Sequence, residues 1–547
     1  MECICPYCGR KSQSSDLCFD FSEQFKLWKK FYFAGCARED VERFGSAFEG
    51  LVNTWRNRGY GPTFFSEAEL LASTGELAST GARDVSRGML TIPTPLWKKK
   101  LRDQRDSVPP AYRELLEFMM GDSFARGGHV LRLEVQYYRE GDGDVRITAV
   151  RDAQGNVIAG RRHCPHCGGV MSYWAGRYPE VVLTVLGGPR ISKSTALAAC
   201  ADVFVHDRAA CAISWQSYGV RTVDGGEVRE KGDKSWLRFE ADCLAPYSAN
   251  RRVEATRTGS AEAIPRFSVL VRVGRKTNLI LTVVDLPGEY SLDRERLGVS
   301  DAIFKEYQNF YQNVDCVWYC TDELELRQIS IRDEDRADQA KYGYSGGRQA
   351  TPTDELVARM SQLSSLFRKD VPVVFLLGKS DTIEAGGQLR SVLYRDDYRP
   401  GAPSDWLEAE GSRTPVLRAK DFCDRAHRLR TYLREQNPRL IQQFEEHFPV
   451  HTFLATSNYG HGFREDGTPA GERRPFQTEA PFLWMLAMLG YLPAADGDRE
   501  YYAVDRAGGE NGDQLTWENL GMCGRSAGGY RSHRSRRGGM LGLLKGR

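Results

Sequence analysis

Lys193 and Ser194 follow a segment whose residue types suit the binding of a nucleoside triphosphate. Residues 181–187 are an apolar, β-branched run that is typical of a buried strand. A glycine-containing loop comes next, and residues 196–200 have a helix-forming composition. In such an arrangement backbone N–H groups surround the phosphates, the lysine neutralises the outer two, and the hydroxyl binds Mg²⁺. The segment therefore predicts a phosphate-binding loop.

This loop departs from the pattern G-x-x-x-x-G-K-[ST] at one position. Gly187, Lys193 and Ser194 match the pattern, whereas Ser192 stands in the place of the second glycine. A glycine there lets the backbone approach the phosphates closely, so the motif needs support from the rest of the chain. The residues that we expect to contact the nucleotide in this loop are Gly187, Gly188, Arg190, Ser192, Lys193, Ser194 and Thr195.

A second apolar run, residues 278–284, ends in an acidic residue. Asp285 closes the run and Gly288 follows it. In phosphate-loop proteins an aspartate at the carboxyl end of such a strand lies beside Mg²⁺. Gly288 can offer its N–H to a γ-phosphate with no side chain in the way. We therefore predict that Ser194 and Asp285 hold Mg²⁺.

Two later strand ends have residue types that suit the recognition of a base. Residues 371–377 are apolar and lead into Lys379 and Asp381. Guanine presents N1–H and N2–H₂ donors, which the Asp381 carboxylate can accept together while the Lys379 stem lies over the base. The alternative is a buried strand that runs into a charged surface turn. A further strand before Ser457 and Asn458 predicts a backbone N–H near the guanine carbonyl.

Four cysteines in two nearly identical C-P-x-C-G sequences predict a zinc site. Cys5 and Cys8 belong to the first sequence, and Cys164 and Cys167 to the second. Each is a tight turn that directs two thiolates toward one point, and four protein ligands leave no open position for catalysis. We expect a structural zinc ribbon, with nucleic-acid binding as the less favoured alternative. The spare candidate ligands are Cys3 and His166.

The order of sequence patterns predicts five regions. Residues 1–18 are the first half of the zinc ribbon, and residues 19–129 carry an aromatic stripe that predicts a helical insertion. Residues 130–175 alternate as a β-meander and contain the second half of the ribbon, so we expect ribbon and meander to form one small sheet. Residues 179–493 alternate strand and helix, which predicts an α/β fold with a doubly wound, mostly parallel sheet. Residues 494–547 are a flexible Gly/Arg-rich tail.

The composition excludes several classes of protein. The chain has 547 residues, 41% of them hydrophobic, and a net charge of +2, which gives no general attraction to nucleic acid or to a membrane. No apolar run approaches the roughly 20 residues that span a bilayer, and the N-terminus lacks the features of a signal peptide. We expect a cytoplasmic protein without a membrane span, in which the 14 cysteines are thiols and metal ligands.

Together these motifs resemble those of P-loop GTPases of the translation-factor-related group, which includes the Ras-like proteins. The resemblance rests on the phosphate loop, on the D-x-x-G motif from Asp285 to Gly288, and on an N-K-x-D motif in which Gly378 replaces asparagine. With its split zinc ribbon, the chain is most similar to bacterial double-GTPase type proteins of conflict and defence systems. The resemblance implies a P-loop NTPase fold with GTP or GDP, Mg²⁺ and Zn²⁺ as its cofactors.

The resemblance also implies a switch that hydrolyses GTP slowly to GDP and phosphate. A threonine before the D-x-x-G strand is expected to sense Mg²⁺ and the γ-phosphate, and Thr258 is preferred over Thr256. Glu289 stands where Ras-like proteins have a glutamine that orients water. The expected partners are a protein effector or activator and, through the basic tail, weakly bound nucleic acid. A non-hydrolysing scaffold and an ATPase remain the alternatives. The expected catalytic residues are Lys193, Thr258, Asp285, Gly288 and Glu289.

Overall fold

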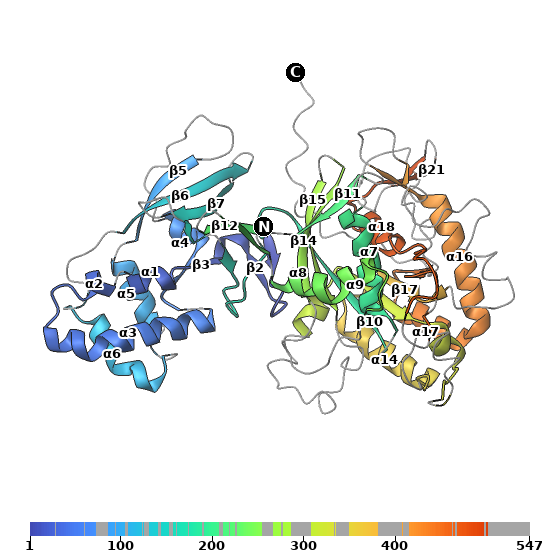
Figure 1. Ribbon diagram of the computed structural model, residues 1–547, viewed down its shortest axis with the longest axis horizontal. Helices are drawn as coiled ribbons and strands as arrows, with labels where there is room; N and C mark the ends of the chain where they lie inside the picture. Colours follow the sequence, from blue (N-terminus) through green and yellow to red (C-terminus); the bar gives the residue numbers. More distant parts are fainter. Residues whose placement is uncertain are drawn as a thin grey trace, which may run out of the picture. The chain divides into compact units, whose positions relative to one another are not determined.

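The computed structural model divides into two compact units, Met1–Glu180 and Val181–Arg547 (Figure 1). The structure describes residues 1–27, 29–59, 61–72, 86–92, 94–103, 105, 108–122, 124, 131–140, 144–151, 157–159, 161–172, 174–188, 191–206, 212–217, 219–224, 227–232, 234–253, 266–274, 277–285, 308–332, 334, 349–380, 407–408, 415–461, 463–464, 468–496 and 499–501.

The described residues of the first unit form three separate small sheets. Strands β1 (Glu2–Ile4) and β2 (Lys11–Gln13) form a hairpin, and β4 (Phe64–Ser66), β3 (Cys18–Asp20) and β9 (Arg162–His163) form a second sheet. The third sheet has the order β5 (Ser86–Ile92), β6 (Leu131–Glu140), β7 (Asp144–Arg151) and β8 (Val157–Ala159). The expectation of one sheet for ribbon and meander was therefore wrong, because β9 pairs with β3 and not with the meander. The predicted meander is confirmed, and β5 from the region expected to be helical extends it.

The helices of the first unit pack through their aromatic side chains. In the longest of them, α3 (Arg38–Arg58), Phe44, Phe48 and Trp55 are buried, which confirms that the aromatic stripe is core. The Phe33 and Phe48 rings meet edge to face with centroids 5.7 Å apart. The other helices are α1 (Ser22–Leu27), α2 (Lys29–Tyr32), α4 (Glu67–Ala72), α5 (Thr94–Asp103), α6 (Arg113–Met120) and the 3₁₀ turns η1 (Ser14–Asp16) and η3 (Pro110–Tyr112).

A buried ion pair joins the second and third sheets of this unit. Arg162 of β9 and Glu67 of α4 have side chains only 4% and 0% exposed, and an Arg162 Nη2 lies 3.2 Å from Glu67 Oε1. The same carboxylate accepts from the N–H of Ile147 in β7, and Arg162 donates to the Ile147 carbonyl oxygen at 2.7 Å. Since both charges are hydrogen-bonded as well as paired, their burial is compensated.

The second unit is built on a seven-stranded sheet, which confirms the α/β prediction. The strand order is β11 (Ile213–Gln216), β14 (Arg266–Val273), β15 (Thr277–Asp285), β10 (Glu180–Gly187), β16 (Cys316–Thr321), β17 (Val373–Leu377) and β20 (His451–Ala455). Strands β10, β16, β17 and β20 are parallel neighbours, whereas β14 is antiparallel to both β11 and β15. The strands with parallel partners are buried along almost their whole length, as in a sheet covered on both faces.

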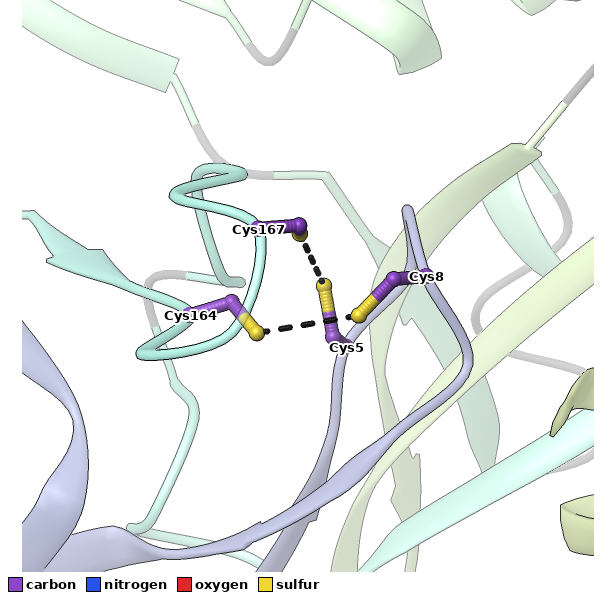
Figure 2. A group of neighbouring side chains, drawn as sticks. All are labelled: Cys5, Cys8, Cys164 and Cys167. Carbon is purple, nitrogen blue, oxygen red and sulfur yellow. Dashed lines mark hydrogen bonds between the residues drawn. The ribbon is translucent and has the colours of Figure 1, made fainter. Parts of the chain in front are cut away.

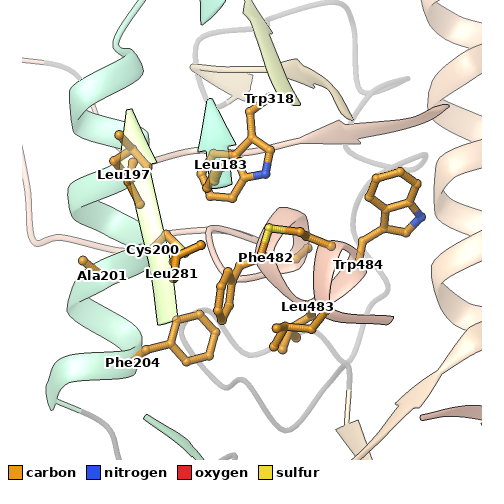
Figure 3. Packing of buried hydrophobic residues seen from close by; sticks show 14 of the residues in the cluster. Leu183, Leu197, Cys200, Ala201, Phe204, Leu281, Trp318, Phe482, Leu483 and Trp484 are labelled. Atoms are coloured by element: carbon orange, nitrogen blue, oxygen red, sulfur yellow. The ribbon is translucent and has the colours of Figure 1, made fainter. Parts of the chain in front are cut away.

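Helices cover both faces of this sheet. On one face Phe204 of α7 (Lys193–His206) packs on Phe482 of α18 (Ala480–Met488), with centroids 4.9 Å apart (Figure 3). All nine residues of α18 are buried, so the helix lies within the core rather than covering it with one face. On the other face Phe375 of β17 meets Phe444 of α17 (Pro438–His447), with centroids 4.9 Å apart.

The remaining elements lie between these strands in the chain, except β21 (Ala494–Asp496) and β22 (Arg499–Tyr501), which follow β20. Residues 215–252, longer than a simple connection requires, contain regular structure: β12 (Gly219–Asp224), β13 (Glu227–Gly232), α8 (Lys234–Phe239), a π-helix (Glu240–Leu244) and α9 (Ala245–Ser248). The elements further along the chain are α12 (Glu323–Arg327), α14 (Thr353–Leu366), β18 (Leu407–Glu408), β19 (Val416–Arg418) and α16 (Ala419–Gln436). Strands β18, β19, β21 and β22 form a small sheet of their own. Within the described part of the chain, no helix is both long and apolar enough to cross a bilayer.

The order of the strands creates a switch point beside β10. After β10 the chain reaches β15 on one side of it, and it then crosses to β16 on the other side. In doubly wound sheets, ligands bind outside the carboxyl ends of the strands at such a point. The carboxyl ends of β10 and β16 meet at the register pair Gly187 and Cys320. The segment predicted to bind phosphate thus begins at the edge where this architecture favours a ligand.

His451 of β20 makes the stability of the second unit dependent on pH. The ring is fully buried against Phe444, and desolvation lowers the pKa of His451 to about 4, although its Nδ1–H donates to the Phe448 carbonyl oxygen at 2.6 Å. An unfolded histidine titrates near 6.5, so between these values only the unfolded chain takes up the proton. We expect the free energy of unfolding to fall by about 3 kcal/mol as the pH drops through this window.

Urea unfolding between pH 7.5 and 4.5 measures this dependence. His451→Gln should remove the loss of stability below pH 6.5, whereas the same change at the exposed His427 should leave it in place. Equal pH profiles for wild type and His451→Gln would show that another group is responsible.

Candidate functional site

Four cysteines of the first unit meet in one buried group. Their sulfur atoms all lie within 4.8 Å of one another, with Cys5 and Cys167 3.6 Å apart and Cys8 and Cys164 3.8 Å apart (Figure 2). A tetrahedral zinc site with Zn–S bonds of about 2.3 Å has sulfur atoms roughly 3.8 Å apart. The group can therefore hold a metal ion such as zinc, and the prediction that the two cysteine pairs meet is confirmed.

Both cysteine pairs are held by the same turn. In the first turn Gly9 N donates to the Cys5 carbonyl oxygen at 3.0 Å. In the second turn Gly168 N donates to the Cys164 carbonyl oxygen at 2.9 Å. The glycines have φ of 67° and 70°, a left-handed conformation that glycine adopts without strain. Backbone N–H groups also point at the sulfurs, as in the 3.4 Å contact from Gly169 N to Cys167. Such donors stabilise thiolate ligands.

The two spare candidates lie outside this group. Cys3 is buried nearby but is not one of the four grouped sulfurs, and the His166 Nε2 lies 3.4 Å from the Lys11 carbonyl oxygen. Burial raises the pKa of the Cys5 thiol, so metal binding must displace a proton from this residue.

Gly59 is a structural residue of this site that the sequence analysis missed. It follows α3 with φ 69°, and a Cβ atom built on it would lie 2.2 Å from the Cα of Gly168. The end of α3 therefore touches the second cysteine turn backbone to backbone, which only glycine permits on either side. The sequence signal was a glycine directly after a long helical pattern, a common helix end.

The phosphate-loop residues stand at the carboxyl end of β10. Gly187 ends the strand with φ 143°, and a Cβ atom there would lie 2.4 Å from the Cys320 carbonyl oxygen. Lys193 begins α7, and its ammonium donates to the carbonyl oxygens of Gly187 at 3.1 Å and of Gly188 at 2.9 Å. Its charge is thus held over the loop that we expect to surround the phosphates. Ser194 and Thr195 continue the first turn of α7, while Arg190 lies outside the described residues.

Ser192 adopts the backbone conformation for which the sequence pattern calls for glycine. Its φ is 65°, in the left-handed region, and its carbonyl oxygen accepts from Ala196 N at 2.9 Å. A left-handed conformation costs a residue with a side chain roughly 1–2 kcal/mol. The serine is therefore accommodated with strain, and the loop keeps the turn that a glycine would give.

Replacing Ser192 with glycine should stabilise the second unit. Relief of the left-handed strain outweighs the extra freedom of glycine in the unfolded chain, for a net gain of up to about 1 kcal/mol. Thermal or urea unfolding measures the change. Ser361→Gly in the exposed face of α14 is the matched control and should cost about 0.5 kcal/mol, because its backbone is helical. A destabilised Ser192→Gly variant would contradict the assignment of strain.

The Mg²⁺ and catalytic candidates are described only in part. Asp285 is the last residue of β15, the strand beside β10, so its backbone stands next to the strand that carries the phosphate loop. The other candidates of this group lie outside the described residues. These are Thr256, Thr258, Gly288 and Glu289, and Asp381 of the base motif lies outside them too.

The base-recognition candidates stand at the carboxyl ends of β17 and β20. Gly378 N donates to the Thr321 carbonyl oxygen at 2.8 Å, and Lys379 follows with φ 54°. Ser457 is buried and its hydroxyl accepts from Gly460 N at 2.9 Å, while the Asn458 carbonyl oxygen accepts from the Tyr247 hydroxyl at 2.6 Å. Parallel strands place both ends at one edge of the sheet, the edge at which β10 ends.

Some buried polar atoms at this edge have no partner. The hydroxyl oxygens of Ser380 and Thr456 and the Oδ1 of Asn458 make no hydrogen bond to the described part of the protein. Buried polar atoms of folded proteins are nearly always bonded, so such atoms call for an explanation. A polar ligand or bound water at the ends of β17 and β20 would supply one.

Acidic residues after β16 are the second feature that the sequence analysis missed. Asp322 is 1% exposed and Glu325 is 2% exposed. Glu325 accepts from Thr351 N at 3.0 Å, and its Oε1 would lie 3.6 Å from a Cβ atom at Gly188, so it stands beside the phosphate loop. The signal was present, since Asp322 directly follows an apolar strand as Asp285 does.

Neither the known protein families nor the curated proteins provide a match for this chain.

Proposed function

We propose that the second unit is a guanine-nucleotide-binding switch that hydrolyses GTP slowly. The observation that carries the proposal is the placement of Lys193, whose ammonium lies over the carbonyl oxygens of Gly187 and Gly188 at the switch point of the sheet. A lysine at the start of a helix after a glycine turn suits a triphosphate, because charge and helix N–H groups act on the same anion. The P-loop type of fold is part of this proposal.

In the proposed complex, Lys193 leaves the loop carbonyls and binds the outer two phosphates. The loop residues 187–192 and the first turn of α7 donate backbone N–H groups to them. The Ser194 hydroxyl and the Asp285 carboxylate are oxygen ligands of the kind that Mg²⁺ prefers, and they come from neighbouring elements. When bound, Mg²⁺ neutralises negative charge on the phosphates.

Hydrolysis in this proposal is an attack of water on the γ-phosphorus. The bond from that phosphorus to the oxygen of the β-phosphate breaks, GDP leaves, and inorganic phosphate and a proton are released. Thr258 and Gly288 contact the γ-phosphate side, and Glu289 orients the water. Because the Glu289 carboxylate adds negative charge beside the γ-phosphate, turnover is slow and is raised by a protein partner.

Guanine selection is assigned to the ends of β17 and β20. Asp381 accepts from the two guanine donors, the Lys379 stem lies over the base, and the segment at Ser457 and Asn458 contacts the guanine carbonyl. The unpartnered atoms of Ser380, Thr456 and Asn458 support a polar ligand at this edge. The zinc-binding first unit and a role in a bacterial conflict or defence system complete the proposal, with an effector protein and weak nucleic-acid contact as its partners.

Chromatography of the nucleotide released from the purified protein tests the proposal, together with GTP and ATP titrations in the presence of Mg²⁺. We expect GTP or GDP, tighter binding of GTP than of ATP, and measurable phosphate release in a single turnover. Preference for ATP would identify an ATPase, and binding without turnover a scaffold. Failure to bind either nucleotide would refute the proposal.

A further inference from the structure

Lys379 is held in a conformation that a residue with a side chain rarely adopts. Its φ is 54°, and backbone hydrogen bonds fix the residues on both sides of it. Gly378 N donates to the Thr321 carbonyl oxygen at 2.8 Å, and Ser380 N donates to that of Thr456 at 3.1 Å. Such strain costs of order 1–3 kcal/mol, persists only where the surroundings impose it, and clusters at functional sites.

The side chain of Lys379 is directed by a buried carboxylate. Its ammonium lies 3.8 Å from Asp322 Oδ2, and the two side chains are 14% and 2% exposed. The other oxygen of Asp322 accepts from Glu325 N at 3.1 Å and thereby caps α12. The carboxylate is thus fixed by a helix start, and solvent screens this ion pair little.

This ion pair lies beside the proposed nucleotide site. A Cβ atom at Gly378 would lie 3.7 Å from the Ile191 carbonyl oxygen, so the residue before Lys379 touches the phosphate loop. Glycine at 378 has no side chain with which to hold its neighbour. Asp322 is the buried acidic group that does so, from the end of the adjacent strand β16.

We propose that Asp322 is a positioning residue for purine recognition: it holds the Lys379 side chain so that the stem lies against the base of a bound nucleotide. This inference rests on the proposed nucleotide-binding function. According to this inference, Asp322 affects recognition of the base although it contacts neither the base nor the phosphates. If the ion pair had a purely structural role, its loss would destabilise the fold and would weaken the binding of all ligands equally.

Calorimetric titration of the full chain with GTP, ATP and inorganic tripolyphosphate tests the inference. Asp322→Asn keeps a side-chain oxygen that caps α12 but loses the charge. It should weaken GTP binding about tenfold, a typical size for a lost charge-assisted contact, and leave tripolyphosphate binding unchanged. Asp315→Asn, at the other end of β16, removes a carboxylate that also forms an ion pair and is the matched control, expected to change neither.

A double-mutant cycle shows whether Asp322 acts through Lys379. If it does, Asp322→Asn combined with Lys379→Gln should bind GTP no more weakly than Lys379→Gln alone. Additive losses, an equal loss for GTP and tripolyphosphate, or no loss in Asp322→Asn would each overturn the inference. If the wild type bound tripolyphosphate as tightly as GTP, the inference about base recognition would be overturned, whereas the proposed phosphate site would still stand. Wild type that binds neither would overturn the proposed function as well.

Discussion

Replacing Cys164 with serine is expected to abolish stoichiometric zinc binding and to destabilise the first unit. The four sulfurs meet across 156 residues of sequence between Cys8 and Cys164, so a bound ion cross-links the two turns. Structural zinc contributes on the order of 10 kcal/mol in small zinc-binding domains. Loss of a residue that only hydrogen-bonds to a metal ligand typically lowers metal affinity roughly 10–100-fold. Loss of one of the four ligands themselves should lower zinc affinity by more than that.

Zinc content of the purified protein and its unfolding curve measure this effect. The second turn contacts the end of α3 through Gly168 and Gly59, so loss of the metal should loosen the helical insertion too. We expect limited proteolysis to cut the first unit of Cys164→Ser early and the second unit at the wild-type rate. Chelation of the wild type should reproduce this pattern.

Cys3→Ser is the matched control for the zinc prediction. Cys3 is buried close by but stands outside the group of four sulfurs, so this variant should retain one zinc ion per chain. Equal zinc content in Cys164→Ser and wild type would exclude the assigned ligand set.

Replacing Lys193 with alanine is expected to reduce triphosphate binding and single-turnover hydrolysis by about 100-fold or more. The side chain supplies the one lysine charge that the described structure places over the phosphate loop, at 3.1 and 2.9 Å from the two loop carbonyls. Removal of a single preorganised charge or donor costs a reaction about 10²–10³ in rate. Folding should change little, because among the described residues the lysine bonds to two backbone carbonyls that can turn to water.

Filter binding of labelled GTP and single-turnover phosphate release provide the two readouts. Lys369→Ala removes an exposed lysine before β17, at the opposite edge of the sheet, and should behave as wild type. Asp285→Ala should reduce hydrolysis and its dependence on Mg²⁺. Unchanged rates in Lys193→Ala would place any hydrolysis at another site.

Local sequence patterns predicted several strands of the large sheet of the second unit. Strands β10, β15, β17 and β20 coincide with the apolar runs that the sequence places at 181–187, at 278–284, at 371–377 and before Ser457. These elements could be predicted because a buried strand must be apolar along its length. The prediction of an α/β sheet followed from their alternation with helices. The phosphate-loop and base motifs were found in the same way, as polar residues directly after such runs.

The strand pairing of the first unit could not be predicted from local sequence patterns. Strand β5 lies in a region whose aromatic spacing predicts helices, and it is a strand because β6 pairs with it along seven residues. Likewise β9 is only two residues long and joins β3, which no local pattern specifies. Strand pairing depends on contacts between distant residues, and its register carries no local signature.

By itself the sequence determined the C-P-x-C-G turns, the strand, loop and helix around Lys193, and the polar residues at the ends of the later strands. Each of these depends on neighbours within a few residues, whose backbone preferences and hydrogen bonds are written into the chain. Only the tertiary structure decided that Gly59 packs against the second cysteine turn, that Ser192 takes a left-handed turn, and that the Lys379 ammonium lies beside Asp322. Those features depend on segments that are distant in the sequence and that the packing of the whole unit brings together. In the buried interior, polar interactions between such segments are stronger than they would be in water.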